Sequence, residues 1–167
     1  MTTGGRHPAR TGWQRSWVRA LTTVLTLVMM AAIFCFSAED GDRSNSTSGF
    51  VAEIVIPVVA PDYGKLSPRD RLDVYNQVQF VVRKCAHFTE YLILGFLIRC
   101  CLESWMGGRK KQGWFAWILG TAYAGTDEAH QLLVAGRGAQ VLDVVIDSCG
   151  VWVGVSLANL LIRRRRT

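Results

Sequence analysis

Long hydrophobic stretches separated by polar segments dominate the chain. Four of them reach the length of about 20 residues that a membrane-spanning helix needs, at residues 17–36, 84–102, 114–134 and 141–162. No charged residue lies between Leu21 and Phe36, or between Val151 and Ile162. A soluble helical bundle would need a polar face on every helix, and the first helix has none. The pattern therefore predicts an all-α integral membrane protein with four transmembrane helices.

The segment between the first two stretches predicts a loop at the membrane surface. Residues 39–49 are polar, and residues 50–60 are apolar but interrupted by Pro57 and too short to span. We expect a short interfacial helix there. Further on, Ser67 is a capping residue, Pro68 suits the first helical position, and Asp70 completes a capping-box-like pattern. The helix that begins here is expected to continue into the second transmembrane helix.

The first hydrophobic stretch resembles a signal peptide in its basic start, and small residues, Ser37 and Ala38, follow it. Its apolar run is longer than the roughly 7–15 residues of a signal peptide. We therefore expect a retained helix. The five cysteines form no C-x-x-C pair and their number is odd, so we expect no disulfide framework and no zinc knuckle. Because all lie in or beside apolar runs, they are predicted to be small buried side chains.

Charge is distributed unevenly along the chain. The 19 Lys and Arg residues exceed the 13 Asp and Glu residues, which gives a net charge of +6. The tails 1–16 and 163–167 and the connection after the second helix are basic, whereas residues 39–82 carry seven acids against four bases. Basic segments stay on the cytoplasmic side of a membrane. We therefore predict a multi-pass protein of the cell membrane with both termini inside, a membrane domain at 17–162, and a disordered N-terminal tail.

The basic tails have two further interpretations, lipid contact and nucleic-acid binding. Anionic lipids attract basic segments next to a membrane helix. No aromatic or glycine-rich nucleic-acid reader accompanies these tails. Membrane lipids are therefore the expected partners, and no nucleic acid is expected.

Polar residues interrupt the hydrophobic stretches at one level. Given the predicted orientation, they fall near the outer ends of the second, third and fourth helices, and they include five of the 13 acids and two of the three histidines. The layer consists of Lys84, His87, Glu90, Tyr91, Asp127, Glu128, His130, Gln131, Arg137, Asp143 and Asp147. At the opposite ends, polar residues are nearly absent apart from Arg99 and Glu103. The one-sided placement favours binding or surface chemistry over passage through the membrane.

The helical period places these residues on packing faces. At 100° per residue, one face holds Lys84, His87, Tyr91 and Gly95, with Glu90 at its edge. A second holds Asp127, His130 and Gln131 with Ala116, Gly120 and Ala124, and Glu128 flanks it. A third holds Asp143 and Asp147 with Gly150, Gly154 and Ala158. Small residues mark close approach of membrane helices, so we expect an outward polar pocket sealed beneath by small-residue contacts.

Structural explanations exist for single members of the layer. Asp143 or Asp147 could act only as a hydrogen-bonded link between helices, Lys84 could extend to the membrane surface, and Arg137 could anchor a lipid phosphate. The whole set is harder to explain this way. Each buried charge costs about 2.5–3.5 kcal/mol on the insertion scale, and nine ionisable groups share this level.

The motifs themselves resemble those of the VanZ-like family. They run from Arg83 through Lys84-Cys85-Ala86-His87-Phe88-Thr89-Glu90-Tyr91, then Asp127-Glu128-Ala129-His130-Gln131, Gly136-Arg137, and Asp143 with Asp147 and Gly150. The resemblance covers about residues 17–162. Two places depart from the family pattern: Glu39 stands where Gln is common, and Leu133 and Ala135 stand where Phe and Pro are common. The resemblance implies a small bacterial membrane protein related to one linked to teicoplanin resistance.

Three functions fit the predicted pocket. The first is binding of a lipid-linked cell-wall precursor or a lipophilic glycopeptide, with Lys84 and Arg137 on a phosphate or carboxylate. The second is an enzyme in which His87 or His130 acts as general base, with Glu90, Asp127 or Glu128 as the paired acid. The third is proton-coupled transport, which four helices without a repeat disfavour. The spacing matches no known metal-ligand signature, so no metal and no cofactor are expected.

Overall fold

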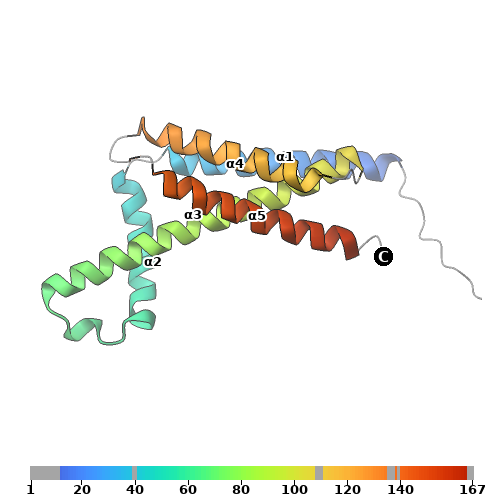
Figure 1. Cartoon of the computed structure of the whole chain (residues 1–167). Coiled ribbons are helices and arrows are strands. Elements are labelled where there is room, and N and C mark those ends of the chain that lie inside the picture. Colours follow the sequence, from blue (N-terminus) through green and yellow to red (C-terminus); the bar gives the residue numbers. More distant parts are fainter. Residues whose placement is uncertain (1–11, 39–40, 108–110, 135–137, 139, 165–167) are drawn as a thin grey trace, which may run out of the picture.

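The computed structural model describes residues 12–38, 41–107, 111–134, 138 and 140–164. It contains five α-helices: α1 (Gly12–Ser37), α2 (Gly41–Val59), α3 (Pro68–Met106), α4 (Gln112–Gln131) and α5 (Val141–Arg164), with a short 3-10 turn, η1 (Tyr63–Lys65), before α3. No strand occurs in the described part of the chain, which confirms the all-helical prediction. In Figure 1, α1, α4 and α5 run alongside the second half of α3, while α2, η1 and the start of α3 project to one side.

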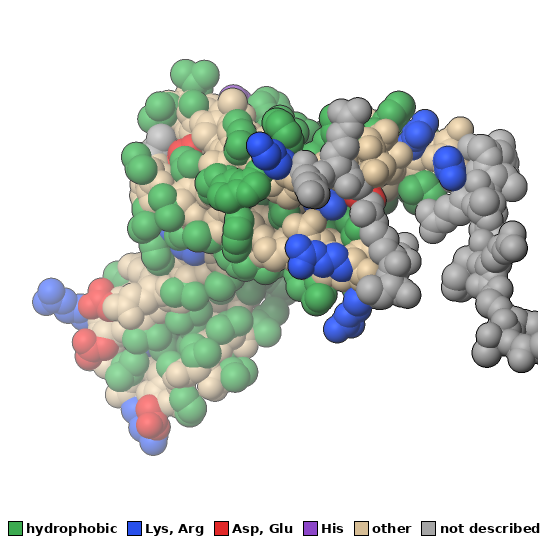
Figure 2. All heavy atoms as spheres, turned by 45° about the vertical axis from the view of Figure 1, so that its right-hand side comes forward, with side chains coloured by type: hydrophobic (Ala, Val, Ile, Leu, Met, Phe, Trp, Pro, Cys, Tyr) green, Lys and Arg blue, Asp and Glu red, His purple; other side chains and the backbone are tan. Residues whose placement is uncertain are grey.

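The bundle has two ends of different chemistry. The C-terminal ends of α1 and α4, the middle of α3 and the start of α5 form the carboxylate end, which carries Lys84, Asp127 and Asp143. The start of α1 and the C-terminal ends of α3 and α5 form the arginine end, which carries Arg15 and Arg164. Figure 2 shows Lys and Arg side chains gathered near the arginine end, which comes forward in that view.

Three of the helices are long and apolar enough to cross a membrane, among the residues that the structure describes. They are Arg15–Ser37, Pro68–Met106 and Val141–Arg164. The third predicted span, α4, is not among them. Although α4 has 20 residues, it buries polar side chains such as Gln112, Asp127 and Glu128, which lower its hydropathy.

The predicted start of α3 is confirmed. The Ser67 hydroxyl accepts a hydrogen bond from the Asp70 backbone N–H at 3.3 Å, and Pro68 lies in the first turn. The helix then continues without a break to Met106 and ends at Gly107, whose φ of +63° is the left-handed conformation that favours glycine. The 39 residues of α3 give it a length of roughly 59 Å.

The prediction of a polar loop at 39–49 is wrong for the described residues from Gly41 onward. Residues 41–49 belong to α2, which continues through Pro57 and ends two residues later at Val59. The cause is packing against α3: Ser48, Ala52 and Ile56 recur every four residues and are all buried. Near the helix end, Pro57 disturbs few backbone hydrogen bonds. Burial of these three side chains against α3 compensates for the low helix propensity of the polar segment.

Other boundaries also shift. Residues 12–16, predicted as part of a disordered tail, are the first turn of α1. The third predicted helix ends at Gln131 rather than at residue 134, and Arg163 and Arg164 extend α5 into the predicted C-terminal tail. Among the described residues the cysteines form no disulfide, but Cys35, Cys85 and Cys149 are exposed rather than buried. In a membrane, a small apolar side chain on the lipid-facing surface costs nothing, so burial is not required.

The core lies where α3, α4 and α5 meet. Its buried side chains include Leu94 and Ile98 of α3, Ala116 and Ala124 of α4, and Val151 of α5. Glycines permit the closest approach: a Cβ at Gly95 would lie 2.5 Å from the Val151 carbonyl oxygen, and one at Gly150 would lie 2.5 Å from the Phe88 carbonyl oxygen. The expected small-residue contacts are therefore present below the polar layer.

Candidate functional site

The most prominent contact at the carboxylate end is an ion pair between Lys84 of α3 and Asp143 of α5. Both side chains are less than one-fifth exposed, at 15% and 17%. Asp143 lies in the first turn of α5, where the helix dipole favours a negative charge. The Lys84 ammonium also lies 4.9 Å from the centroid of the Phe80 ring, at cation–π distance. The pair joins the two helices at the mouth of the polar layer.

One turn deeper, His87 of α3 faces Asp147 of α5. The Nδ1 of His87 and Oδ2 of Asp147 are 3.9 Å apart, and the Asp147 side chain is 2% exposed. This distance is too long for a direct hydrogen bond. Because α3 and α5 run in the same direction here, the His87–Asp147 contact is a second contact between the two helices, one turn below the Lys84–Asp143 pair.

The third wall of the layer comes from the end of α4. Asp127, Glu128 and Gln131 are all buried, and Asp127 lies beside the fully buried Tyr91 of α3. Glu128 closes the connection to α5, because its Oε1 accepts a hydrogen bond from the Gln140 backbone N–H at 2.5 Å. The α4 carboxylates thus face the polar residues of α3 and α5.

The carboxylates form one electrostatic cluster. Asp147 interacts with the charges of four other acids, namely Asp143, Asp127, Glu128 and Glu90. Several buried atoms of the cluster have no hydrogen-bond partner within the described ranges. They are Glu128 Oε2, His130 Nδ1, Gln131 Nε2 and Asp147 Oδ1. Buried polar atoms in folded proteins are normally hydrogen-bonded, so these atoms are equipped to bind a polar ligand or water.

A cavity of about 200 Å³ opens between the three helices at this point. Its lining contains four predicted residues, Lys84, His87, Gln131 and Asp143, together with Phe80, Arg83, Gly138 and Gln140. A second cavity of about 230 Å³ lies between α1, α2 and α3, with apolar walls such as Phe36 and Val51. Arg83 and His87 line both cavities. The polar cavity therefore adjoins a largely apolar one.

The remaining predicted residues differ in position. Glu90 lines the apolar cavity rather than the polar one. His130 packs against Phe34 of α1, with ring centroids 4.5 Å apart. Arg137 lies outside the described residues. Within the described ranges, no group of three or more His, Cys, Asp or Glu side chains converges closely enough to hold a metal ion.

Sequence reasoning missed part of the polar lining. Phe80 lies one turn before Lys84, so the helical period used for the other residues would have found it. Arg83 adjoins Lys84 and begins the motif, but it was not among the predicted site residues. Gln140 precedes α5 and lines the cavity, where its backbone N–H donates to Glu128 of α4. No sequence signal predicts that contact.

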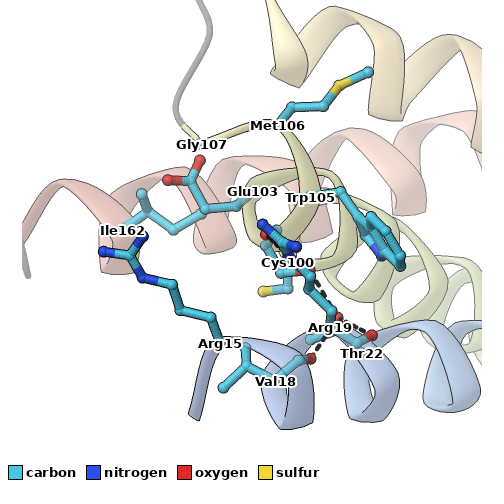
Figure 3. A pocket seen from close by; sticks show the side chains of 11 residues that line it. Arg15, Val18, Arg19, Thr22, Cys100, Glu103, Trp105, Met106, Gly107 and Ile162 are labelled. Atoms are coloured by element: carbon cyan, nitrogen blue, oxygen red, sulfur yellow. Dashed lines mark hydrogen bonds between the residues drawn. The ribbon is translucent and has the colours of Figure 1, made fainter. Parts of the chain in front are cut away.

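The expectation that the opposite end is nearly free of polar residues is wrong. The arginine end contains a cavity of about 780 Å³ with Arg15, Arg19, Thr22, Glu103 and Ser104 in its lining (Figure 3). These residues come from two helices, so none of the single hydrophobic stretches reveals the group.

The hydrogen bond of Glu128 yields a local prediction. Glu128→Ala should loosen the α4–α5 connection by about 1–2 kcal/mol, because the Gln140 N–H loses its acceptor. Amide hydrogen exchange of the peptide spanning the connection should accelerate roughly tenfold. Glu53→Ala, which removes an exposed carboxylate of α2, is the control. Equal exchange in both variants would show that the bond does not hold the connection.

Comparison with known proteins identifies the family of the chain. A family model described as VanZ/LLP1 matches residues 22–162. No curated protein and no solved structure matches the chain. The match includes all three helices that supply the polar layer, from Lys84 on α3 to Asp147 on α5. Since it spans most of the 167 residues, the chain belongs to the VanZ/LLP1 family.

Proposed function

We propose that the chain is a multi-pass protein of the cell membrane in which α1, α3, α4 and α5 all span, with both termini inside. Three of these helices have the length and composition of spans. The 20 residues of α4 extend over roughly 30 Å, the thickness of the hydrocarbon layer. Its polar side chains Gln112, Asp127 and Glu128 are buried in the bundle, where α4 packs against α3 and α5, rather than directed to lipid. The basic segments then orient the carboxylate end outward.

In this orientation, the carboxylate end binds the polar part of a lipid-linked cell-envelope precursor or of a lipophilic glycopeptide. The main support is that Glu128, Gln131 and Asp147 each hold one buried polar atom that has no hydrogen-bond partner among the described residues. Of these residues, Gln131 lines the polar cavity, whose lining also holds the Lys84–Asp143 pair. Such a protein would contribute to teicoplanin-type resistance or to maintenance of the cell envelope.

The two adjoining cavities fit an amphiphilic ligand. Lys84 and Arg83 can hold a phosphate or carboxylate through charge-assisted hydrogen bonds. The buried carboxylates can accept hydrogen bonds from amine or sugar hydroxyl groups. The apolar cavity beyond His87, walled by Phe36 and Val51, offers a surface for the hydrocarbon part.

A growth assay tests this function. His87→Ala should remove protection against teicoplanin in a sensitive bacterial host, because His87 lines both cavities. The measurement is the inhibitory concentration of teicoplanin, with vancomycin alongside, at matched membrane levels of each protein. We expect the wild-type chain to raise the concentration several-fold and the variant to leave it at the level of the empty host.

Thr89→Ala is the matched control on the same helix. Thr89 is exposed, bonds only to the Cys85 carbonyl of its own helix at 2.7 Å, and lines neither cavity. It should protect as well as the wild type. Protection retained by His87→Ala would contradict a role for the pocket, and a wild type that protects no better than the empty host would contradict the resistance role.

The His87–Asp147 contact favours a second candidate, an enzyme acting on the same kind of ligand. His87 Nδ1 lies 3.9 Å from the buried Asp147 carboxylate, and a histidine next to a buried carboxylate is a suitable general base. It could activate a water or a substrate hydroxyl for hydrolysis or transfer. Asp147→Asn would then reduce product formation by far more than it weakens ligand binding.

Proton-coupled transport receives less support. The carboxylate end and the arginine end are separated by a core of apolar side chains, including Leu94, Ile98 and Val151. From Lys84 to Arg99, α3 rises roughly 22 Å, and the α3 residues buried between Tyr91 and Arg99 are Leu94, Gly95 and Ile98, none of which is polar. A proton relay would need polar groups along it.

A further inference from the structure

The cavity at the arginine end is larger than either cavity at the carboxylate end. It has a volume of about 780 Å³ and lies between the start of α1, the end of α3 and the end of α5 (Figure 3). Its lining combines charged and apolar side chains. They are Arg15, Val18, Arg19, Thr22, Cys100, Glu103, Ser104, Trp105, Met106, Gly107 and Ile162.

The three apolar spans fix the depth of this cavity in a membrane. One begins at Arg15, one ends at Met106 and one ends at Arg164. Because span ends lie where the hydrocarbon layer meets the headgroups, the cavity lies at headgroup level. A lipid phosphate is the anion most abundant at that depth.

Arg19 is held in place for binding an anion. Its Nε donates to the Ser104 carbonyl at 3.0 Å, and its guanidinium carbon lies 5.3 Å from the centroid of the Trp105 ring. The terminal guanidinium nitrogens form no hydrogen bond with the described residues. An arginine fixed in this way loses little conformational freedom when it binds a phosphate.

Arg15 lies one helical turn before Arg19 on the same face of α1. It extends toward Ile162 of α5 (Figure 3) and forms no ion pair within the described ranges. Two like charges four residues apart on a helix repel each other. An anion between them would turn that repulsion into attraction.

The acid in the cavity does not cancel these charges. Glu103 accepts from Arg99 Nη1 at 3.1 Å, and Arg99 Nε in turn donates to Asn159 Oδ1 at 2.7 Å. Arg99 is 6% exposed and balances Glu103 from within the bundle. The charges of Arg15 and Arg19 remain, and they favour an anionic ligand over a zwitterionic one.

We propose that this cavity binds an anionic phospholipid of the adjacent leaflet. Arg15 and Arg19 hold its phosphate, and the upper part of an acyl chain lies against Val18, Trp105 and Ile162. Since the family match begins at residue 22, both arginines precede the matched region. The proposal rests on membrane insertion as proposed above, but not on any ligand at the carboxylate end.

A lipid titration of the full-length protein tests it. The purified protein in detergent is titrated with phosphatidylglycerol, with phosphatidylcholine as the zwitterionic comparison, and bound lipid is counted by native mass spectrometry. Arg15→Gln/Arg19→Gln should weaken phosphatidylglycerol binding by roughly tenfold, since charge-assisted bonds are lost. Arg163→Gln, which removes a neighbouring basic charge outside the cavity lining, should change the affinity less than about twofold.

Three further arms separate the alternatives. Val18→Trp should fill the cavity and weaken binding with both arginines intact. This variant tests the proposal even if the double variant fails to fold.

Glycerol phosphate at equal concentration should not compete, because it lacks the acyl part; effective competition would identify a soluble phosphate ligand and overturn the proposal. His87→Ala should bind phosphatidylglycerol like the wild type. If Arg163→Gln lost as much phosphatidylglycerol affinity as the double variant, the lipid would be attracted by general surface charge. That result would overturn the proposal.

Discussion

Gly154→Val should cost about 3 kcal/mol or more of stability, because α3 and α5 touch backbone to backbone at this residue. A Cβ at Gly154 would lie 2.8 Å from the Phe96 backbone nitrogen and closer still to the Leu92 carbonyl oxygen. Backbone atoms cannot move aside without separating the helices. The unfolding midpoint in detergent micelles, followed by circular dichroism, measures the loss.

Gly125→Val is the matched control for this experiment. Gly125 lies within α4, and no described atom lies within 4 Å of a Cβ placed there. The same substitution therefore changes helix propensity without a clash, and the midpoint should move only slightly. Equal shifts for both variants would mean that the close approach of α3 and α5 does not stabilise the bundle.

Lys84→Met should destabilise the carboxylate end by about 2 kcal/mol and abolish any protection against teicoplanin. The substitution leaves the Asp143 carboxylate, which is only 17% exposed, without its ammonium partner. Removing one member of a buried ion pair is strongly destabilising, and the partial exposure here reduces the effect. Thermal unfolding and the growth assay give the two readouts.

The double variant Lys84→Met/Asp143→Leu separates structure from function. Replacing both members of a buried pair by apolar residues is often neutral, so stability should return to within about 1 kcal/mol of the wild type. Protection should stay lost, because the charged groups at the mouth of the cavity are gone. A double variant that protects fully would show that the pair only joins α3 to α5.

Much of the bundle could be predicted because each helix carries its own signal. The cap at Ser67 is a local feature that predicts the start of α3, whereas the helix continues past the predicted end at residue 102 to Met106. Burial of Tyr91, Asp127 and Asp147 follows from the helical period, since small residues on the same faces mark the packing side. The helix Gly41–Val59 could not be predicted in the same way, because it is stabilised by packing of Ser48, Ala52 and Ile56 against α3, a segment distant in sequence.

The site could be predicted as a group but not as a set of contacts. The pairing of Lys84 with Asp143, and of His87 with Asp147, depends on the register of α3 against α5, which Gly150 and Gly154 fix in three dimensions. The packing of His130 on Phe34 depends in the same way on the position of α1. At the arginine end, Arg15 and Glu103 come together from separate helices, and each alone has the appearance of an ordinary basic or acidic helix end.

The length of α3 has a mechanical consequence. At roughly 59 Å it is about twice the hydrocarbon thickness. In the membrane orientation proposed above, its first half and α2 would therefore stand outside the bilayer as an arm. Mixed acids and bases gather at the tip of this arm (Figure 2). Because α3 is one continuous helix, a force on the tip would be transmitted past Lys84, near its middle, to Met106 at its other end. Binding of another molecule to the arm on one side of the membrane would thus displace the end of α3 on the other side, and paired spin labels at Leu72 and Met106 would keep a fixed separation throughout.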